Sequence, residues 1–168
     1  PGTIHEKKAL NGVNLHLDDG DFVTIIGGNG AGKSTTLNAI AGVWPVDNGS
    51  ITIDGINVTG IPEFKRAKYL GRVFQDPMTA LNPVKTVGDQ IAEVVRLHND
   101  NHVNPEERAK EMLETVGIPA ERYSEYPHQF SGGMKQRVVI AIALACNPDL
   151  LLADEPTTAL DVTIQAQV

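Results

Sequence analysis

Eight consecutive residues near the start of the chain have the types and order of a phosphate-binding loop. Two glycines separated by four residues are followed directly by a lysine and a serine, in the run Gly27-Gly28-Asn29-Gly30-Ala31-Gly32-Lys33-Ser34. Glycines let the backbone turn tightly and direct successive N–H groups at phosphate oxygens. Lys33 can reach the β- and γ-phosphates, and Ser34 can offer its hydroxyl to Mg²⁺. The residues from Gly27 to Thr35 therefore predict a site for Mg-ATP.

The loop requires a strand before it and a helix after it, because the phosphates bind at a helix N-terminus. Leu10 to Leu17 suggests an irregular strand, and Phe22 to Ile26 is a short apolar run of β type. The pattern then predicts a helix over Lys33 to Ala41, ended by Gly42. A chance glycine turn is the alternative, and this predicted context favours phosphate binding over it.

An apolar run that ends in two acids predicts a metal site late in the chain. Leu150 to Ala153 reads as a buried strand, followed by Asp154 and Glu155. Asp154 is placed to hold Mg²⁺ through water, and Glu155 is placed to polarise the attacking water. Taken alone, the pair fits a solvated strand end equally well. The phosphate-binding loop favours the catalytic interpretation.

A second predicted helix start can bind an anion. Ser131 can cap a helix that runs to about Cys146, while Gly132 and Gly133 leave its first N–H groups accessible. An ordinary helix cap explains this segment by itself. One nucleotide does not need two such helix starts from one chain, however. The two helix starts are explained if two copies of the chain face each other and each copy covers the other's nucleotide.

The remaining pattern predicts an α/β fold with a mostly parallel sheet. Asp54-Gly55 predicts a tight hairpin between Ser50–Ile53 and Ile56–Val58, and a further strand is expected over Gly71 to Phe74. Helical spacing from Thr86 to about Glu125 indicates a small helical insertion. Its second helix should begin at Asn104, which is followed by proline and two acids.

With these motifs in this order, and with Ala159-Leu160-Asp161 after them, the sequence resembles the ATPases of ABC transporters. The resemblance implies a P-loop NTPase core of RecA-like type, an N-terminal antiparallel β subdomain and an inserted α-helical subdomain. It implies one incomplete ABC ATPase domain over 1–168, with the RecA-like core plus the β subdomain in 1–80 and 131–168 and the helical subdomain in 81–130. It also assigns Gln75 a catalytic role, in contact with Mg²⁺ and the attacking water.

The same resemblance implies a C-terminally truncated domain, since the family's switch histidine would lie beyond Val168, and slow hydrolysis by this chain. The stretches Phe74–Pro83 and His128–Gln165 resemble the peptide and nickel importer branch, whereas Lys8–Arg72 looks like another group of bacterial uptake ATPases. The implied function is ATP hydrolysis coupled to import of a small solute such as a peptide. The implied partners are a second ATPase subunit, membrane permease subunits and, indirectly, a solute-binding protein, at the cytoplasmic face of the membrane.

Composition narrows the alternatives. The 168 residues carry a net charge of −7 and no basic stripe, so no nucleic-acid partner is expected. The longest apolar run, Val138 to Cys146, is nine residues, whereas a membrane-spanning helix needs about 20. A repair or translation ATPase of the same family and a nucleotide-binding module without turnover are the competing functions. Repair members carry a long coiled coil, and no sustained heptads occur here; Glu155 argues against a dead site.

Several residues that can do chemistry are assigned structural roles instead. We expect His98 and His102 to lie in a solvated loop and His128 to fix the loop before Ser131. We expect Cys146 and Trp44 to pack in the core and Arg137 to pair locally. The stretch Val138–Leu144 should be core.

Overall fold

The fold is taken from a computed structural model that describes residues 10–73, 80–98 and 103–153. The helices are α1 (Lys33–Ala41), α2 (Glu63–Arg66), α4 (Val87–His98), α5 (Pro105–Thr115) and α6 (Gly132–Leu144), with 3-10 turns at Ala120–Ser124 and Pro127–Gln129. The strands are β1 (Thr52–Ile53), β2 (Ile56–Asn57), β3 (Leu70–Val73) and β4 (Leu150–Ala153).

The four described strands form two separate pairs. β3 and β4 are parallel, with Leu70 opposite Leu150 and Val73 opposite Ala153. β1 and β2 are antiparallel and are joined at Asp54 and Gly55, whose φ angles of 44° and 73° are both positive, as a primed two-residue turn requires. The predicted hairpin and the strand that begins near Gly71 are therefore confirmed. The parallel sheet is confirmed as a pair of strands within the described residues.

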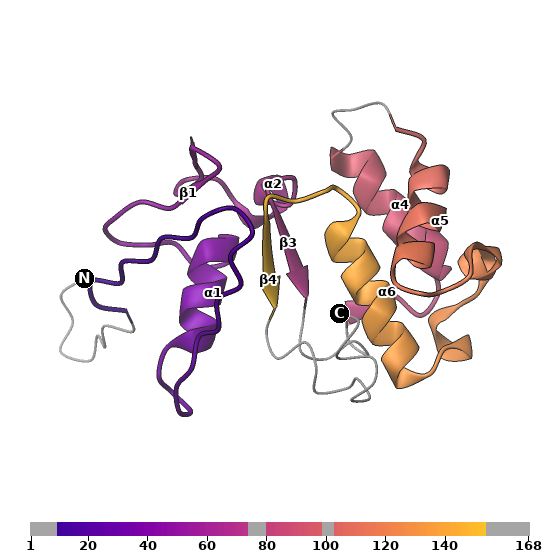
Figure 1. The fold of residues 1–168 in the computed structure, drawn as a ribbon, viewed down its shortest axis with the longest axis horizontal. Coiled ribbons are helices and arrows are strands. Elements are labelled where there is room, and N and C mark those ends of the chain that lie inside the picture. Colours follow the sequence, from indigo (N-terminus) through magenta and orange to yellow (C-terminus); the bar gives the residue numbers. More distant parts are fainter. Residues whose placement is uncertain (1–9, 74–79, 99–102, 154–168) are drawn as a thin grey trace.

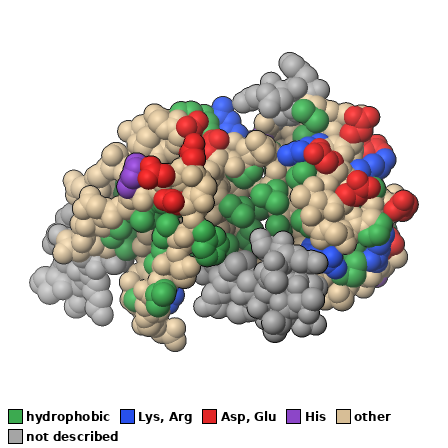
Figure 2. Space-filling view, in the orientation of Figure 1, with side chains coloured by type: hydrophobic (Ala, Val, Ile, Leu, Met, Phe, Trp, Pro, Cys, Tyr) green, Lys and Arg blue, Asp and Glu red, His purple; other side chains and the backbone are tan. Residues whose placement is uncertain are grey.

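The strands predicted ahead of the glycine-rich loop are wrong for this structure. Residues 10–26 contain no strand, and the side chains of Phe22 and Ile26 are 94% and 89% exposed. A strand is stable only with a hydrogen-bonded neighbour, and the described strands pair only with one another. Figure 2 accordingly shows hydrophobic side chains at the surface on the side of α1.

β4 was predicted to be buried, and only Leu152 in it is. The physical reason is that successive side chains of a strand point to opposite faces: Leu152 packs into the cluster around Ala41, whereas Leu151 points to the other face and is 43% exposed. α6 packs tightly against β3. A Cβ on Gly71 would lie 2.3 Å from the carbonyl oxygen of Ala143, which shows how closely α6 lies against β3.

Two hydrophobic clusters hold these elements together. The larger joins α4, α5 and α6, and its fully buried members include Ile91, Leu113 and Val138. The predicted core stretch Val138–Leu144 lies in it, with Ile142 and Leu144 partly buried. The smaller cluster, built around Ala41, packs α1 against the hairpin and the parallel strands. Burial of this kind stabilises a fold by roughly 25 cal/mol for each Å² of apolar surface removed from water.

The predicted helix ends are confirmed. Asn104 caps α5, and its side-chain oxygen accepts from the N–H of Glu106 at 3.0 Å. Gly42 ends α1 in the left-handed conformation, with φ 82°. Figure 1 shows that α1 and α6 both begin, and β3 and β4 both end, toward the lower side of the molecule. The fold therefore directs two helix N-termini and two strand ends to one side.

Candidate nucleotide site

The glycine-rich loop has the backbone geometry that its sequence predicts. Gly30 and Gly32 have φ of 81° and 89°, in the left-handed region that residues with a Cβ rarely adopt. Gly32 is also the N-cap of α1, so no side chain caps this helix start. A helix N-terminus carries a partial positive charge and N–H groups without partners inside the helix. The loop thus leaves the first turn of α1 accessible to an anion.

Lys33 lies back over the loop that precedes it. Its Nζ donates to the carbonyl oxygens of Gly27 and Gly28, the latter at 3.2 Å. The N–H of Ala31 donates to the Gly28 carbonyl at 3.1 Å, which closes the loop. A Cβ on Gly27 would lie 2.9 Å from the Cβ of Ala31, so the closed loop has no room for a side chain there. The cation is therefore held directly beside the predicted phosphate position.

The other predicted ligands fall partly inside the described residues. Ser34 is exposed and Thr35 half-buried in the first turn of α1. Ser131 is the predicted N-cap of α6, and its Oγ accepts from the N–H of Met134 at 3.3 Å. Gly132 and Gly133 form the first turn of that helix. Gln75, Asp154, Glu155 and Ala159-Leu160-Asp161 lie outside the described residues.

Hydroxyl and carboxylate oxygens are the donors that Mg²⁺ prefers, and the predicted set supplies them. Ser34 is exposed in the first turn of α1, and α1 begins on the side toward which β3 and β4 run (Figure 1). Asp154 follows the last residue of β4 directly in the sequence. The residues present therefore fit a magnesium ion. Within the described ranges no cluster of three or more His, Cys, Asp or Glu side chains is placed to hold a metal by itself.

A pair of residues that the sequence analysis missed supports the segment before α6. Arg122 donates to a carboxylate oxygen of Glu125 at 2.6 and 2.9 Å, and its guanidinium lies 4.2 Å from the ring centroid of Phe130. This hydrogen bond raises the pKa of Arg122 and lowers the pKa of Glu125. His128, predicted to fix this loop, stacks on Tyr126 with 5.8 Å between ring centroids. The signal in the sequence that could have indicated the pair is Glu125, an acid three residues after Arg122.

α1 is also anchored by two arginines that the sequence analysis did not single out. Nη2 of Arg72, on β3, donates to Oδ1 of Asn38 at 2.6 Å. Arg66, at the end of α2, is buried against the carboxyl end of α1. Both contacts join residues more than 25 positions apart in the chain. No local pattern in the sequence indicates such pairs.

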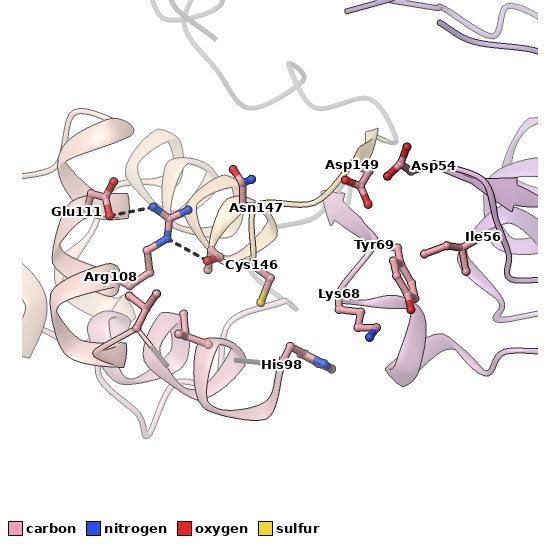
Figure 3. A pocket seen from close by; sticks show the side chains of 13 residues that line it. Asp54, Ile56, Lys68, Tyr69, His98, Arg108, Glu111, Cys146, Asn147 and Asp149 are labelled. Carbon is pink, nitrogen blue, oxygen red and sulfur yellow. Dashed lines mark hydrogen bonds and ion pairs between the residues drawn. The ribbon is translucent and has the colours of Figure 1, made fainter. Parts of the chain in front are cut away.

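Away from the predicted nucleotide residues lies a cavity of about 530 Å³ (Figure 3). Residues near the ends of α4 and α6, and in the segments that lead into β3 and β4, line this cavity. Arg108 borders it and donates to the carbonyl of Ala145 at 3.1 Å and to Glu111 at 2.8 Å. Cys146 also borders it, and burial raises the pKa of its thiol. This cavity shares no residue with the predicted nucleotide site.

The residues assigned structural roles need four corrections. Cys146 is half-buried beside the cavity and not enclosed in the core, because α6 ends before it. His98 is the last residue of α4 and not part of a loop, because the helix extends to it. Trp44 is 48% exposed and not packed in the core, because the residues that follow α1 lie at the surface. Arg137 donates to the carbonyls of Val116 and Gly117, about 20 residues away, so its pairing is not local. His102 lies outside the described residues.

Comparison with known proteins identifies the family of this chain. The family described as ABC transporter matches residues 10–158. The chain belongs to the ABC transporter family. Among curated relatives of this ABC chain, the oligopeptide transport ATP-binding protein OppD of Bacillus subtilis is 50% identical, over 97% of this chain and 49% of that protein. OppD of Escherichia coli is 46% identical, over 95% and 50% respectively.

The ABC chain spans about half the length of the curated relatives it matches. The match to the oligopeptide relatives runs along nearly all of it, so the likeness extends beyond the second half. A solved structure titled as the dimeric post-hydrolysis state of the ATP-binding cassette MJ0796 with ADP and Pi has a TM-score of 0.80 and 34% identity, and covers 95% of this chain and 71% of that one. In the part of the chain that is described, no helix has the length and apolar character of a membrane span.

Proposed function

We propose that this chain binds Mg-ATP as part of the ATPase subunit of an importer of oligopeptides. The observation that carries the proposal is the start of α1, where Gly30 and Gly32 adopt left-handed backbone conformations and Lys33 lies over the loop. Backbone N–H groups at an uncapped helix start, together with a fixed cation, match the charge and shape of a triphosphate. Membership of the ABC transporter family supports the same assignment.

In the proposed reaction each residue has a separate task. Lys33 and the amides of the loop bind the β- and γ-phosphates, and Ser34 and Asp154 hold Mg²⁺, which when bound neutralises charge on the phosphates. Glu155 accepts a proton from the attacking water, and Gln75 orients that water. Hydrolysis of ATP then drives import. Catalysis here rests on positioning of the phosphates and the water, because phosphoryl transfer needs little covalent chemistry from the protein.

We also propose that two ATPase subunits share each nucleotide. Ser131, Gly132 and Gly133 start α6 with accessible N–H groups, and this second anion site suits the γ-phosphate held by a partner. The description of MJ0796 as a dimeric cassette supports this arrangement. Membrane permease subunits, and a solute-binding protein acting through them, would complete an importer at the cytoplasmic face of the membrane. Peptides are the proposed cargo because the relatives are named for oligopeptide transport.

The test is a titration with Mg-ATP. Lys33→Ala removes the cation beside the phosphates and should weaken binding roughly tenfold or more. Lys110→Ala is the matched control, since Lys110 pairs with Glu106 on α5 and is placed in no nucleotide site. Equal ATP affinity of the unchanged chain and Lys33→Ala would contradict the proposed site.

A further inference from the structure

Arg66 is a buried cation whose hydrogen-bond partners among the described residues are all backbone carbonyls. It is 2% exposed, and its guanidinium donates to the carbonyls of Ile61 at 2.6 Å and Thr59 at 2.9 Å and, on α1, to those of Ala39 at 3.0 Å and Ile40 at 2.6 Å. No carboxylate of the described residues forms an ion pair with it. A buried charge costs several kcal/mol unless hydrogen bonds compensate, so these four carbonyls are what keep Arg66 in place.

These bonds complete the carboxyl end of α1. The last carbonyls of a helix have no partner within it and carry partial negative charge. The Asn38 carbonyl accepts from the N–H of Val43 at 3.0 Å, and the Ala39 carbonyl accepts from the N–H of Gly42 at 3.2 Å. Arg66 adds a second donor to Ala39 and is the donor to Ile40. A cation at this end of the helix is electrostatically favourable.

The turn after α1 is shaped to admit this guanidinium. A Cβ on Gly42 would lie 2.6 Å from Nε and 2.8 Å from Cζ of Arg66. The glycine that ends α1 therefore serves two purposes: it adopts the left-handed conformation, and it leaves space for the arginine. A side chain at position 42 would therefore displace the guanidinium that makes the four hydrogen bonds.

α1 has nine residues, so its two ends are about 14 Å apart. The phosphate-binding amides are at one end and Arg66 is at the other. A tilt of α1 by about 5° around the Arg66 end would move the amides by roughly 1 Å. Hydrogen bonds weaken over a few tenths of an ångström, so phosphate binding depends on the direction of this short helix.

We propose that Arg66 is a positioning residue for the nucleotide phosphates: by joining the carboxyl end of α1 to the Thr59–Ile61 segment, it sets the direction in which the amino end of α1 presents its N–H groups. This inference rests on the proposed nucleotide site. It assigns a positioning role to a residue at the opposite end of α1 from the glycine-rich loop.

The experiment measures Mg-ATP binding by calorimetric titration, which gives the dissociation constant and the stoichiometry separately, together with thermal unfolding. Arg66→Met keeps much of the side chain and removes all four donors, and Arg66→Lys keeps the charge with a single ammonium. Arg108→Met is the matched control, because Arg108 likewise donates to a carbonyl at the end of a helix, that of Ala145 after α6. All three substitutions should lower the melting temperature.

The expected result is a dissociation constant about tenfold weaker for Arg66→Met, an intermediate value for Arg66→Lys and a value within about twofold of the unchanged chain for Arg108→Met.

A purely structural role would lower the melting temperature and the stoichiometry while leaving the dissociation constant of the folded molecules unchanged. That outcome, in Arg66→Met or, if this variant does not fold, in Arg66→Lys, would overturn the inference. Failure of the unchanged chain to bind Mg-ATP would instead overturn the proposed function, so the two failures are distinguishable.

Discussion

Val73 and Ala153 lie opposite each other as the last paired residues of β3 and β4. In the sequence, Gln75 follows two positions after the first, and Asp154 directly after the second. The carboxyl ends of parallel strands meet at one edge of a sheet, where ligands of open α/β folds bind. Because α1 also begins toward this side (Figure 1), the strand register favours a common site for the glycine-rich loop, Gln75 and the two acids.

Glu155→Gln in the ATPase subunit should stop turnover while ATP binding persists, because the amide keeps the shape of the side chain and cannot accept a proton. ATP should then hold two subunits together through Ser131 and Gly133. Phosphate release and size-exclusion chromatography with Mg-ATP check the two parts. Glu121→Gln, an exposed acid in a 3-10 turn, is the control. A Glu155→Gln variant that stays monomeric with Mg-ATP would argue against the shared site.

Gly27→Val should weaken ATP binding by roughly tenfold or more, because its Cβ would lie 2.9 Å from the Cβ of Ala31 and force the loop open. Gly60→Ala is the control, since a Cβ there meets no atom within 4 Å. Titration with a fluorescent ATP analogue compares the two variants. Unchanged affinity in Gly27→Val would show that the closed loop is not the conformation that binds nucleotide.

Ser131→Ala and Asn104→Ala each remove one side-chain helix cap, on α6 and α5 respectively. Each should destabilise the chain by about 1 kcal/mol, as measured by urea unfolding. Only Ser131→Ala should also reduce ATP-dependent dimerisation, because only that helix start is proposed to meet a partner's nucleotide. If both variants dimerise equally, Ser131 is no more than a cap.

Low pH should weaken the hydrogen bond between Arg122 and Glu125 and so destabilise the segment that precedes α6. The hydrogen bond from Arg122 lowers the pKa of Glu125, so the folded state binds its proton less readily than the unfolded state. The resulting stability is present above the unfolded pKa, about 4.3, and is lost as pH falls through the lower folded pKa. Glu125→Gln should therefore flatten the fall in melting temperature between about pH 5 and pH 3. A variant with the same acid profile as the unchanged chain would contradict this.

Local interactions in the sequence predicted much of the fold. The bounds of α1 depend on Gly32 and Gly42, whose left-handed conformations a side chain would oppose. Asn104 and Ser131 satisfy N–H groups two and three positions ahead of them, so those helix starts are visible in a few consecutive residues. The glycine-rich loop is likewise visible in a few consecutive residues. For these elements the nearest residues in the chain supply the decisive contacts.

Only the tertiary structure decided the contacts that join distant residues. Phe22 to Ile26 has the composition of a strand, yet a strand also needs a neighbour, and that depends on how the whole chain is arranged. The same holds for the exposed side chain of Leu151 in β4. Arg66 donates to carbonyls at the end of α1 that lie more than 25 positions away in the sequence. Only the folded backbone sets the direction of those carbonyls. Residue types predicted the phosphate chemistry, whereas only packing placed Arg66 at the carboxyl end of α1.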